Sequence, residues 1–213
     1  MIMKRTMFLW IIVALLLIAA IPFFIVNRKI HAAKQFAGVL ERLHVGNENV
    51  GMISNLLTIC RSNCSVTQSS CHESSCDLLF SFDNRALSRL RIVPFGRFSG
   101  AVTVRQGRLV SVSFDYSVNC RGLQFSGVSV REVPDTDQQS PLQVSTGPVG
   151  KPSALSFRIT PRASPDEKAN LYMLNFACLS RRCSKLSELA PGLEKANLLG
   201  ARMTSKMGCQ ALQ

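Results

Sequence analysis

The sequence has little of several residue types that active sites and nucleic-acid interfaces use. It contains three His, one Trp and two Tyr among 213 residues. It has no H-E-x-x-H, no G-x-S-x-G, no Gly-rich phosphate loop and no obvious pair of carboxylates on one predicted element. Sparse aromatic residues and the lack of a recognisable module argue against nucleic acid as a partner. We therefore expect no enzymatic activity, no catalytic residue and no cofactor.

Long hydrophobic runs are also scarce, because the chain has one, from Met7 to Val26. As a helix this run would cover about 30 Å, the thickness of a hydrocarbon core. A single run excludes a multi-pass transporter. A cleaved signal peptide is the alternative, but its apolar region is usually shorter, ~7–15 residues, and no small-x-small site follows the run. We expect a single-pass transmembrane helix over 7–26, a signal-anchor, after an amino-terminal tail 1–6.

The orientation of this anchor depends on two opposing signals. Basic residues flank the run, two before it and four after it: Lys4, Arg5, Arg28, Lys29, Lys34 and Arg42. The positive-inside rule alone therefore places the domain in the cytosol. The charged start and the even set of eight Cys favour an oxidising compartment instead. We expect a membrane protein with the lipid bilayer around residues 7–26 and an extracytoplasmic domain.

Helical periodicity follows the run. Apolar residues at Ile30, Ala33, Ala37 and Leu40 predict a juxtamembrane amphipathic helix over 28–45. A second short helix is predicted over 49–59, at the start of a cysteine-containing domain 46–190. The remaining residues, 191–213, form a weakly patterned carboxyl-terminal tail.

Alternating apolar residues then predict strands. Leu78, Phe80 and Phe82 alternate, and a short helical turn over 85–91 follows them. Residues 98–105 and 108–116 form a predicted hairpin. A three-residue loop with Gly107 in the left-handed conformation would place Val102 opposite Val110 and gather the apolar side chains, Val110 included, on one face.

The following strand, 123–133, changes phase at Gly127, which predicts a β-bulge there. Residues 134–153 are rich in Pro, Gly, Ser, Thr and Gln and predict a long loop, before a strand over 154–160. Ser164 to Glu167 matches a capped helix start. Residues 170–179 fit that helix or a strand, and we favour the strand; a short helix near 185–189 follows. The fold class is α+β: an antiparallel sheet, a meander of hairpins, with the amino-terminal helices packed on one face.

The eight cysteines are the main candidates for covalent or metal chemistry. They are Cys60, Cys64, Cys71, Cys76, Cys120, Cys178, Cys183 and Cys209. The first four have the spacing C-x3-C-x6-C-x4-C, in a segment 60–76 that is typical of a cross-linked or metal-bound loop. His72 with these four could bind zinc, but the central gap is short for a zinc site, and an extracytoplasmic domain favours disulfides. Unpaired thiols are a third alternative. Cys178 and Cys183 would close a small loop.

Basic charge dominates the predicted domain. From residue 27 onward the net charge is +10, and between Arg85 and Arg131 there are eight Arg, no Lys and one acidic residue. Guanidinium groups suit phosphate or carboxylate, so an anionic envelope surface is a candidate partner. The anion-binding candidates are Arg85, Arg89, Arg91 and Arg97. The alternative is that these arginines line solvated surfaces without forming one patch.

The block FDNRALSRLRIVPFGRFSGAVTVRQGRLVSV, residues 82–112, resembles a segment of bacterial proteins with one amino-terminal spanning helix and a small cysteine-containing domain, to which no activity is attached. Leu43-His-Val-Gly46 and the short helix after it are similar to the opening of envelope lipoprotein domains of the SmpA/OmlA type, which have two helices and an antiparallel sheet. The chain lacks their lipidated cysteine, so the resemblance implies no residue roles.

Three functional hypotheses follow. The first is a membrane-anchored, non-enzymatic envelope module that binds a partner protein or an anionic surface. The second is a redox or zinc-binding protein that uses the cysteine cluster. The third is a cytosol-facing basic domain that binds a polyanion, whose binding would weaken steeply with salt.

Overall fold

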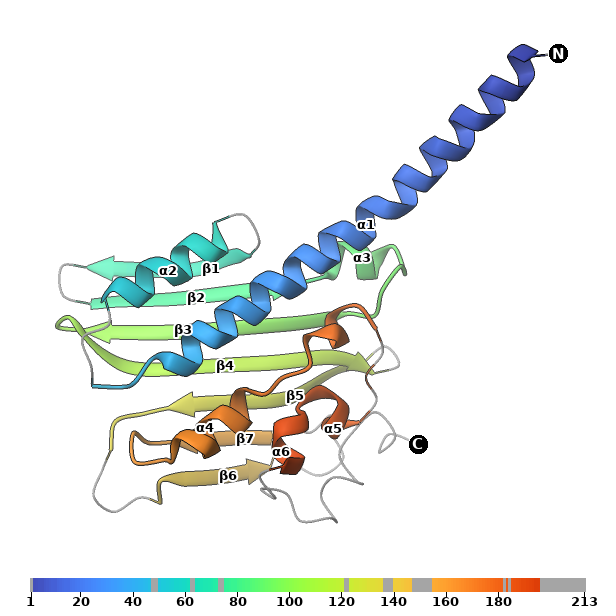
Figure 1. Cartoon of the computed structure of the whole chain (residues 1–213). Helices are drawn as coiled ribbons and strands as arrows, with labels where there is room; N and C mark the ends of the chain where they lie inside the picture. The colour runs from blue at the N-terminus through green and yellow to red at the C-terminus, as the bar shows by residue number, and fades with distance from the viewer. Residues whose placement is uncertain are drawn as a thin grey trace.

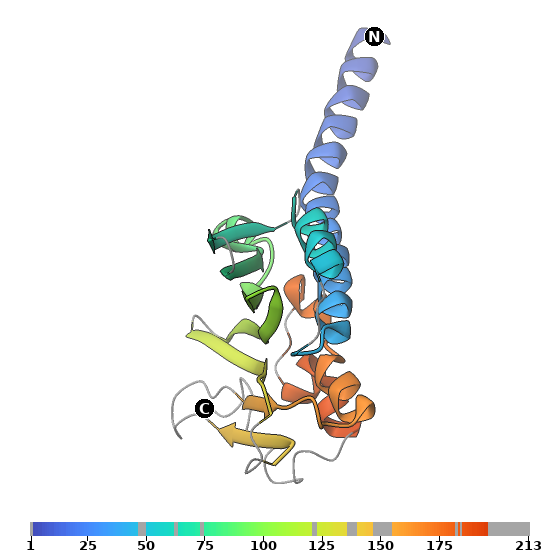
Figure 2. The ribbon, with the colours of Figure 1, turned by 90° about the vertical axis from the view of Figure 1, so that its left-hand side faces the viewer.

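A computed structural model describes residues 2–46, 50–61, 64–72, 75–120, 123–135, 140–146, 155–181, 183 and 185–195. The fold is α+β, with helices on one face of a seven-stranded mixed sheet (Figures 1 and 2). The strands are β1 (Ser65–His72), β2 (Ser75–Asp83), β3 (Gly96–Arg105), β4 (Arg108–Cys120), β5 (Leu123–Glu132), β6 (Leu142–Thr146) and β7 (Leu155–Ile159). The helices are α1 (Ile2–Arg42), α2 (Val50–Cys60), α3 (Arg85–Arg89), α4 (Pro165–Tyr172), the 3-10 turn η1 (Phe176–Leu179), α5 (Leu186–Leu189) and α6 (Pro191–Lys195).

The longest element is α1, one helix of 41 residues that includes both the apolar run and the helix expected over 28–45. Its carboxyl-terminal part packs on the sheet, and its amino-terminal part projects away from the sheet (Figure 1). In the part of the chain that the structure describes, no helix combines the length and apolarity needed to cross a membrane. This finding corrects the expected transmembrane helix over 7–26, the single-pass signal-anchor interpretation and the extracytoplasmic membrane localisation drawn from it.

The core lies between the helices and one face of the sheet. Phe36 of α1 is fully buried, and its ring centroid lies 4.9 Å from that of Phe80 and 5.2 Å from that of Phe82. A Cβ at Gly100 would lie 2.7 Å from Cε1 of Phe36 and 2.9 Å from Cδ1 of Leu40, so the glycine allows α1 to approach β3 closely. The apolar stripe of α1 and the alternating strands are therefore joined by close packing.

The sheet is mixed, which corrects the expected antiparallel meander. Its strand order is β1-β2-β3-β4-β5-β7-β6. β5 pairs with β7 in parallel, whereas β6 pairs antiparallel with β7 at the edge of the sheet. After β5 the chain first forms β6 at the edge of the sheet and then returns to place β7 between β5 and β6. Hairpin spacing describes neighbours along the chain and does not detect such a crossover.

The β3–β4 hairpin differs from its predicted register. Arg105 pairs with Arg108, so the loop has two residues, Gln106 and Gly107, with φ values of 52° and 73°. The left-handed Gly107 is confirmed and the three-residue loop is wrong. Positive φ at both central residues is typical of a type I′ turn, whose twist matches that of the strands.

A register shift in the same hairpin explains its apolar pairing. Val102 pairs with Val112, and Val104 pairs with Leu109, because the register shifts between Thr103 and Val104. The extra residue lets a two-residue turn coexist with a valine–valine pair. Leu109 is consequently buried at the place that alternation assigns to Val110.

Two local predictions are confirmed. The β4–β5 register shifts so that Tyr116 pairs with Val128 and Ser117 with Ser126, which leaves Gly127 as the bulge. A Cβ at Gly127 would lie 1.9 Å from Cδ2 of Leu189, so only glycine allows α5 to pack there. Ser164 caps α4 in a capping box with Glu167, as its sequence predicts.

Three further expectations require correction. The segment 60–76 is not a loop, because it contains β1, which pairs with β2 at the edge of the sheet, where a strand needs few apolar residues. Within the expected loop 134–153 the structure places β6. Residues 170–179 form the end of α4 and the 3-10 turn η1, not a strand, because the capping box starts a helix that its aromatic residues then anchor in the core. The expected tail 191–213 begins with the helix α6, whose Leu193 is buried in the core, and the rest of it lies outside the described residues.

No helix of the described residues covers the second face of the sheet (Figure 2). Its side chains are mostly small and polar, and those of β3 to β7 include Ser99, Thr103, Ser111, Ser113, Asp115, Ser129, Arg131, Ser156 and Arg158. We call this surface the open face. It contrasts with the apolar face under the helices, as strand alternation requires.

Candidate functional site

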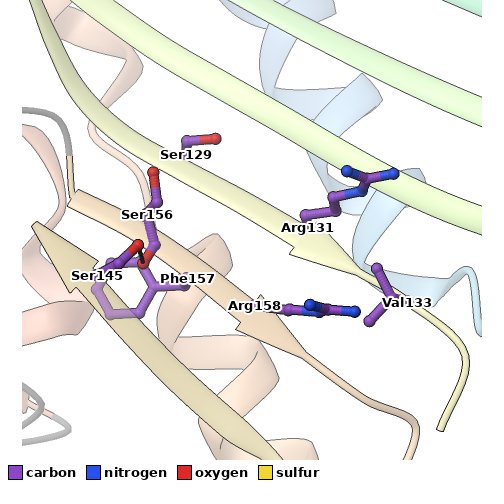
Figure 3. Close-up of a pocket in the computed structure, with 7 residues that line it drawn as sticks. All are labelled: Ser129, Arg131, Val133, Ser145, Ser156, Phe157 and Arg158. Carbon is purple, nitrogen blue, oxygen red and sulfur yellow. Dashed lines mark hydrogen bonds between the residues drawn. The ribbon is translucent and has the colours of Figure 1, made fainter. Parts of the chain in front are cut away.

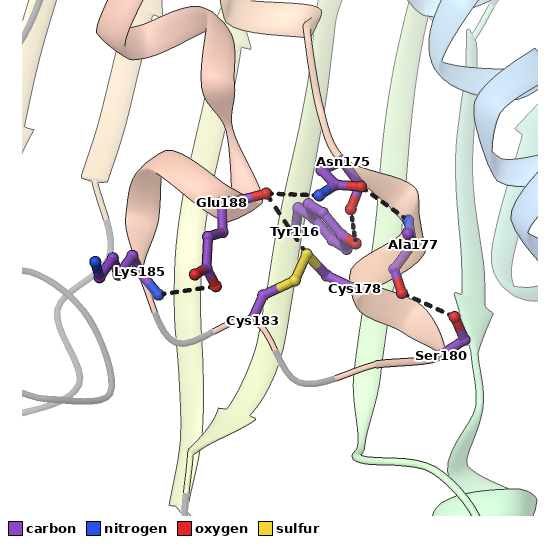
Figure 4. The surroundings of a disulfide bond; sticks show 8 residues. All are labelled: Tyr116, Asn175, Ala177, Cys178, Ser180, Cys183, Lys185 and Glu188. Atoms are coloured by element: carbon purple, nitrogen blue, oxygen red, sulfur yellow. Dashed lines mark hydrogen bonds between the residues drawn. A yellow bond between two sulfur atoms is a disulfide. The ribbon is translucent and has the colours of Figure 1, made fainter.

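The cysteines that the structure describes are in disulfides. Cys60, at the end of α2, is bonded to Cys64, with a Cα–Cα distance of 4.9 Å. Cys178 of η1 is bonded to Cys183, with a Cα–Cα distance of 5.5 Å (Figure 4). Cys76 is also disulfide-bonded and lies opposite Cys71 in the β1–β2 register. Cys209 and the side chain of Cys120 lie outside the described residues. These bonds connect segments close in sequence, and Cys60, Cys178 and Cys183 are buried in the core.

The described cysteines do not form a metal-binding site. Over the described ranges there is no group of three or more His, Cys, Asp or Glu side chains that could hold a metal ion. The sulfur atoms of Cys60, Cys64 and Cys76 are in disulfides, whereas zinc coordination requires thiolates. The side chains of the other two weak candidates, Cys71 and His72, lie outside the described part of the chain.

Three of the four arginine candidates lie together on one projecting segment between β2 and β3. Arg85 and Arg89 are one turn apart on α3, and Arg91 follows with φ of 57°. All three are exposed. Between and after them, Leu90 is 68% exposed and Ile92 is 51% exposed. We call these five residues, Arg85, Arg89, Leu90, Arg91 and Ile92, the arginine ridge.

The base of the ridge is held by buried hydrogen bonds. The side chain of Asn84 is buried, and its Nδ2 donates to the carbonyl oxygen of Pro94 at 2.7 Å and to that of Leu179. Its Oδ1 accepts from the Gly96 amide at 2.8 Å. One asparagine thus connects both ends of the ridge segment to η1. Such a satisfied buried network rigidifies the chain around it.

The ridge lies where α1 leaves the sheet (Figure 1). Lys29 of α1 donates from Nζ to the carbonyl oxygen of Asp83 at 2.6 Å, two residues before α3 begins. On the projecting part of α1, Phe23 is 71% exposed and Phe24 is 68% exposed. The Lys29 contact therefore connects α1 to the residues just before the ridge, and both segments carry exposed apolar side chains.

Arg97, the fourth candidate, is separate from the ridge. It is half-buried on the open face, where its Nε donates to Oγ of Ser81 at 3.0 Å. At the other end of β3, on the same face, Arg105 forms a 2.8 Å salt bridge with Asp77. The hydrogen bond from Arg105 lowers the pKa of Asp77 below its ordinary value of 3.8. Arg97 and Arg105 are thus engaged within the sheet.

A buried ion pair that the sequence analysis did not identify lies under α1. Nζ of Lys168 in α4 is 2.5 Å from Oε2 of Glu132 in β5, and both side chains are almost fully buried. The same ammonium donates to the carbonyl oxygen of Leu43, just after α1, and Oε1 of Glu132 accepts from the Val45 amide at 3.1 Å. A cation at a helix carboxyl terminus also stabilises the helix dipole. The pair therefore joins α1, β5 and α4.

Tyr172 lies beside this pair, and burial raises the pKa of its hydroxyl, with the negative charges of Glu132 and Glu41 adding to the effect. Within the described residues its hydroxyl has no hydrogen-bond partner. These groups are packed inside the fold, whereas the arginine ridge is accessible, so the ridge is the candidate interaction site.

Comparisons with protein-family models, with curated proteins and with solved structures find no match for this chain.

Proposed function

We propose that this protein is a non-enzymatic binding module whose arginine ridge docks an acidic partner protein. The observation that carries the proposal is the exposure of Leu90 and Ile92 on a short, hydrogen-bonded segment flanked by three arginines. Protein interfaces combine an apolar centre with a polar rim, and arginine is enriched among their energetically dominant residues. The basic rim selects a partner with acidic residues around an apolar patch.

The ordered geometry of the ridge favours a partner of defined shape. The amide of Arg91 donates to the Ser88 carbonyl oxygen at 2.9 Å, and that of Ile92 donates to the Leu87 carbonyl oxygen at 3.1 Å. Below them, the Asn84 network fixes the segment to the fold. A segment whose backbone is already ordered loses less conformational entropy on binding, which benefits a shape-complementary protein more than a fluid or repetitive polyanion.

Photocrosslinking in the producing cells tests the proposal. One variant of the full chain carries p-benzoylphenylalanine in place of Leu90, and a second variant carries it in place of Val66, which is 47% exposed on β1. We expect one recurrent protein adduct at position 90 and none of the same mass at position 66. The adduct's sequence should be acidic at the crosslinked surface. Adducts to lipid or nucleic acid, or no specific adduct, would overturn the proposal.

Charge reversal separates a local contact from a general charge effect. In the variant crosslinked at position 90, Arg85→Glu, Arg89→Glu and Arg91→Glu should together abolish the adduct, and Lys at the same positions should retain it. The matched control reverses three exposed basic residues elsewhere, Arg61, Arg108 and Lys195. This control changes the net charge by the same amount as the triple variant of the ridge, and it should leave the adduct intact. Equal loss in both triple variants would contradict docking at the ridge.

A further inference from the structure

A pocket lies on the open face, away from the ridge. It has a volume of about 320 Å³, and β5, β7 and β6 contribute its walls (Figure 3). Its lining residues are Ser129, Arg131, Val133, Ser145, Ser156, Phe157 and Arg158. Its volume is at the lower end of the range for small-molecule sites, about 300–1,000 Å³.

The strand register arranges the polar lining in two rows. Ser129 of β5 pairs with Ser156 of β7, which pairs with Ser145 of β6. Two residues along, Arg131 of β5 pairs with Arg158 of β7. Paired residues point to the same face of a sheet, so a row of hydroxyl groups lies beside a row of two guanidinium groups. In Figure 3 both arginine side chains extend toward the Val133 end of the pocket.

Placing two arginines directly opposite each other is unfavourable unless an anion lies between them. Neither guanidinium forms a salt bridge with a carboxylate in the described ranges. Two acidic residues close in sequence are engaged elsewhere: Glu132 pairs with Lys168, and Asp135 pairs with Arg162 at 2.5 Å. Asp115 lies on the adjacent strand β4, opposite Ser129 and therefore diagonal to Arg131, and it forms no salt bridge with Arg131. Among the described residues, the pocket thus offers the two like charges no salt-bridging carboxylate.

We infer that this pocket binds the phosphate group of a small phosphorylated molecule. Each guanidinium can donate two parallel hydrogen bonds, and the hydroxyls of Ser129 and Ser156 can donate further ones. A phosphate group has enough oxygen atoms to accept from both forks and from a hydroxyl, whereas a carboxylate has two. Val133 also contributes to the lining and adds an apolar residue beside the arginines.

Isothermal titration calorimetry on the full chain tests this site with phenyl phosphate, inorganic phosphate and acetate as probes. We expect phenyl phosphate to bind most tightly and acetate not to bind measurably. Arg131→Gln or Arg158→Gln should each weaken phenyl phosphate binding at least about tenfold, the usual cost of losing one charged hydrogen-bonding partner. The double variant should not bind.

The control is Arg108→Gln, which removes an exposed arginine at the tip of the β3–β4 hairpin and should change the affinity less than about twofold. Equal weakening by Arg108→Gln, or equal binding of acetate and both phosphates, would show a general charge effect and overturn the inference. Unchanged binding by the double variant would also overturn it.

Thermal unfolding gives a second readout that a structural role for the arginines would not reproduce. Without ligand, Arg131→Gln should have a Tm equal to or above that of the unmodified chain, because it removes a repulsion. Phenyl phosphate should raise the Tm of the unmodified chain and not that of the double variant. A lower Tm of ligand-free Arg131→Gln would contradict the inference. The ridge plays no part in these measurements, so they are independent of the proposed docking function.

Discussion

The two faces of the sheet use the same strands for different purposes. On the helix-covered face, Phe98 lies with its ring centroid 5.0 Å from that of Phe176 and 5.9 Å from that of Phe114, and all three are buried. Adjacent to it in sequence, Ser99 points to the open face, which no helix of the described part of the chain covers (Figure 2). Stability is therefore concentrated on one side of the sheet, and the other side is free to bind ligands.

The largest test of this contrast compares neighbouring residues of β3. Phe98→Ala should lower the free energy of unfolding by about 4 kcal/mol, because it removes a buried ring and leaves a cavity. Ser99→Ala, on the open face, should change it by less than about 0.5 kcal/mol. Chemical denaturation of both variants measures the difference. Similar losses would mean that the open face also contributes to the packing.

The buried Lys168–Glu132 ion pair allows the two faces of the sheet to be compared at charged residues as well. Lys168→Met should lower the free energy of unfolding by about 3 kcal/mol, because it leaves the Glu132 carboxylate buried without its partner. Lys168→Met combined with Glu132→Leu should recover much of that loss. Arg131→Gln, one residue from Glu132 but on the open face, is the matched control and should cost nothing. If the double variant is as unstable as Lys168→Met, the ion pair is not the cause.

The disulfide between Cys178 and Cys183 should have an intermediate effect. Replacing both with Ala should lower the free energy of unfolding by about 2 kcal/mol, the loop-entropy value for so short a loop. Both residues are buried on the helix-covered side, so the loss should appear there. Hydrogen exchange should show faster opening of η1 and unchanged protection in β6 and β7. A uniform loss of protection would contradict a local role.

The smallest effect is expected at the Arg105–Asp77 salt bridge. Arg105→Gln should raise the pKa of Asp77 toward its ordinary value of 3.8. A carboxyl group whose pKa is lowered on folding stabilises the fold above its unfolded pKa, and this contribution is lost as the pH falls through the folded pKa. Because both side chains are largely exposed, the Tm at neutral pH should barely change. NMR titration of the Asp77 carboxyl carbon checks the pKa, and an unchanged value would exclude Arg105 as the cause.

Sequence patterns predict the features that depend on nearby residues. The capping box at Ser164, the bulge at Gly127 and the left-handed Gly107 each follow from a few adjacent positions. The predicted register near Val110 is wrong because a β-bulge changes which residues of the hairpin pair, and alternation alone does not locate it. The apolar run over 7–26 lies within α1, and the spanning-helix prediction is wrong because no helix of the described residues is long and apolar enough to cross a membrane.

The sites that depend on distant residues could not be predicted in this way. Lys168 and Glu132 are 36 residues apart, and α4 brings them together only after β7 has inserted beside β5. The same insertion places Arg158 opposite Arg131. The arginine ridge could be predicted in part, because Arg85, Arg89 and Arg91 are close in sequence. The exposure of Leu90 and Ile92 required the structure, since apolar residues are usually expected inside.

The continuity of α1 has a mechanical consequence. At 1.5 Å per residue, its 41 residues form a rod about 60 Å long, fixed to the sheet along its second half. A force applied to the projecting end would act on the domain as on a lever, with its fulcrum near Lys29. A sideways pull would peel the apolar stripe from the sheet one turn at a time, whereas an axial pull would shear all the turns at once. The molecule should therefore resist tension along α1 far better than tension across it.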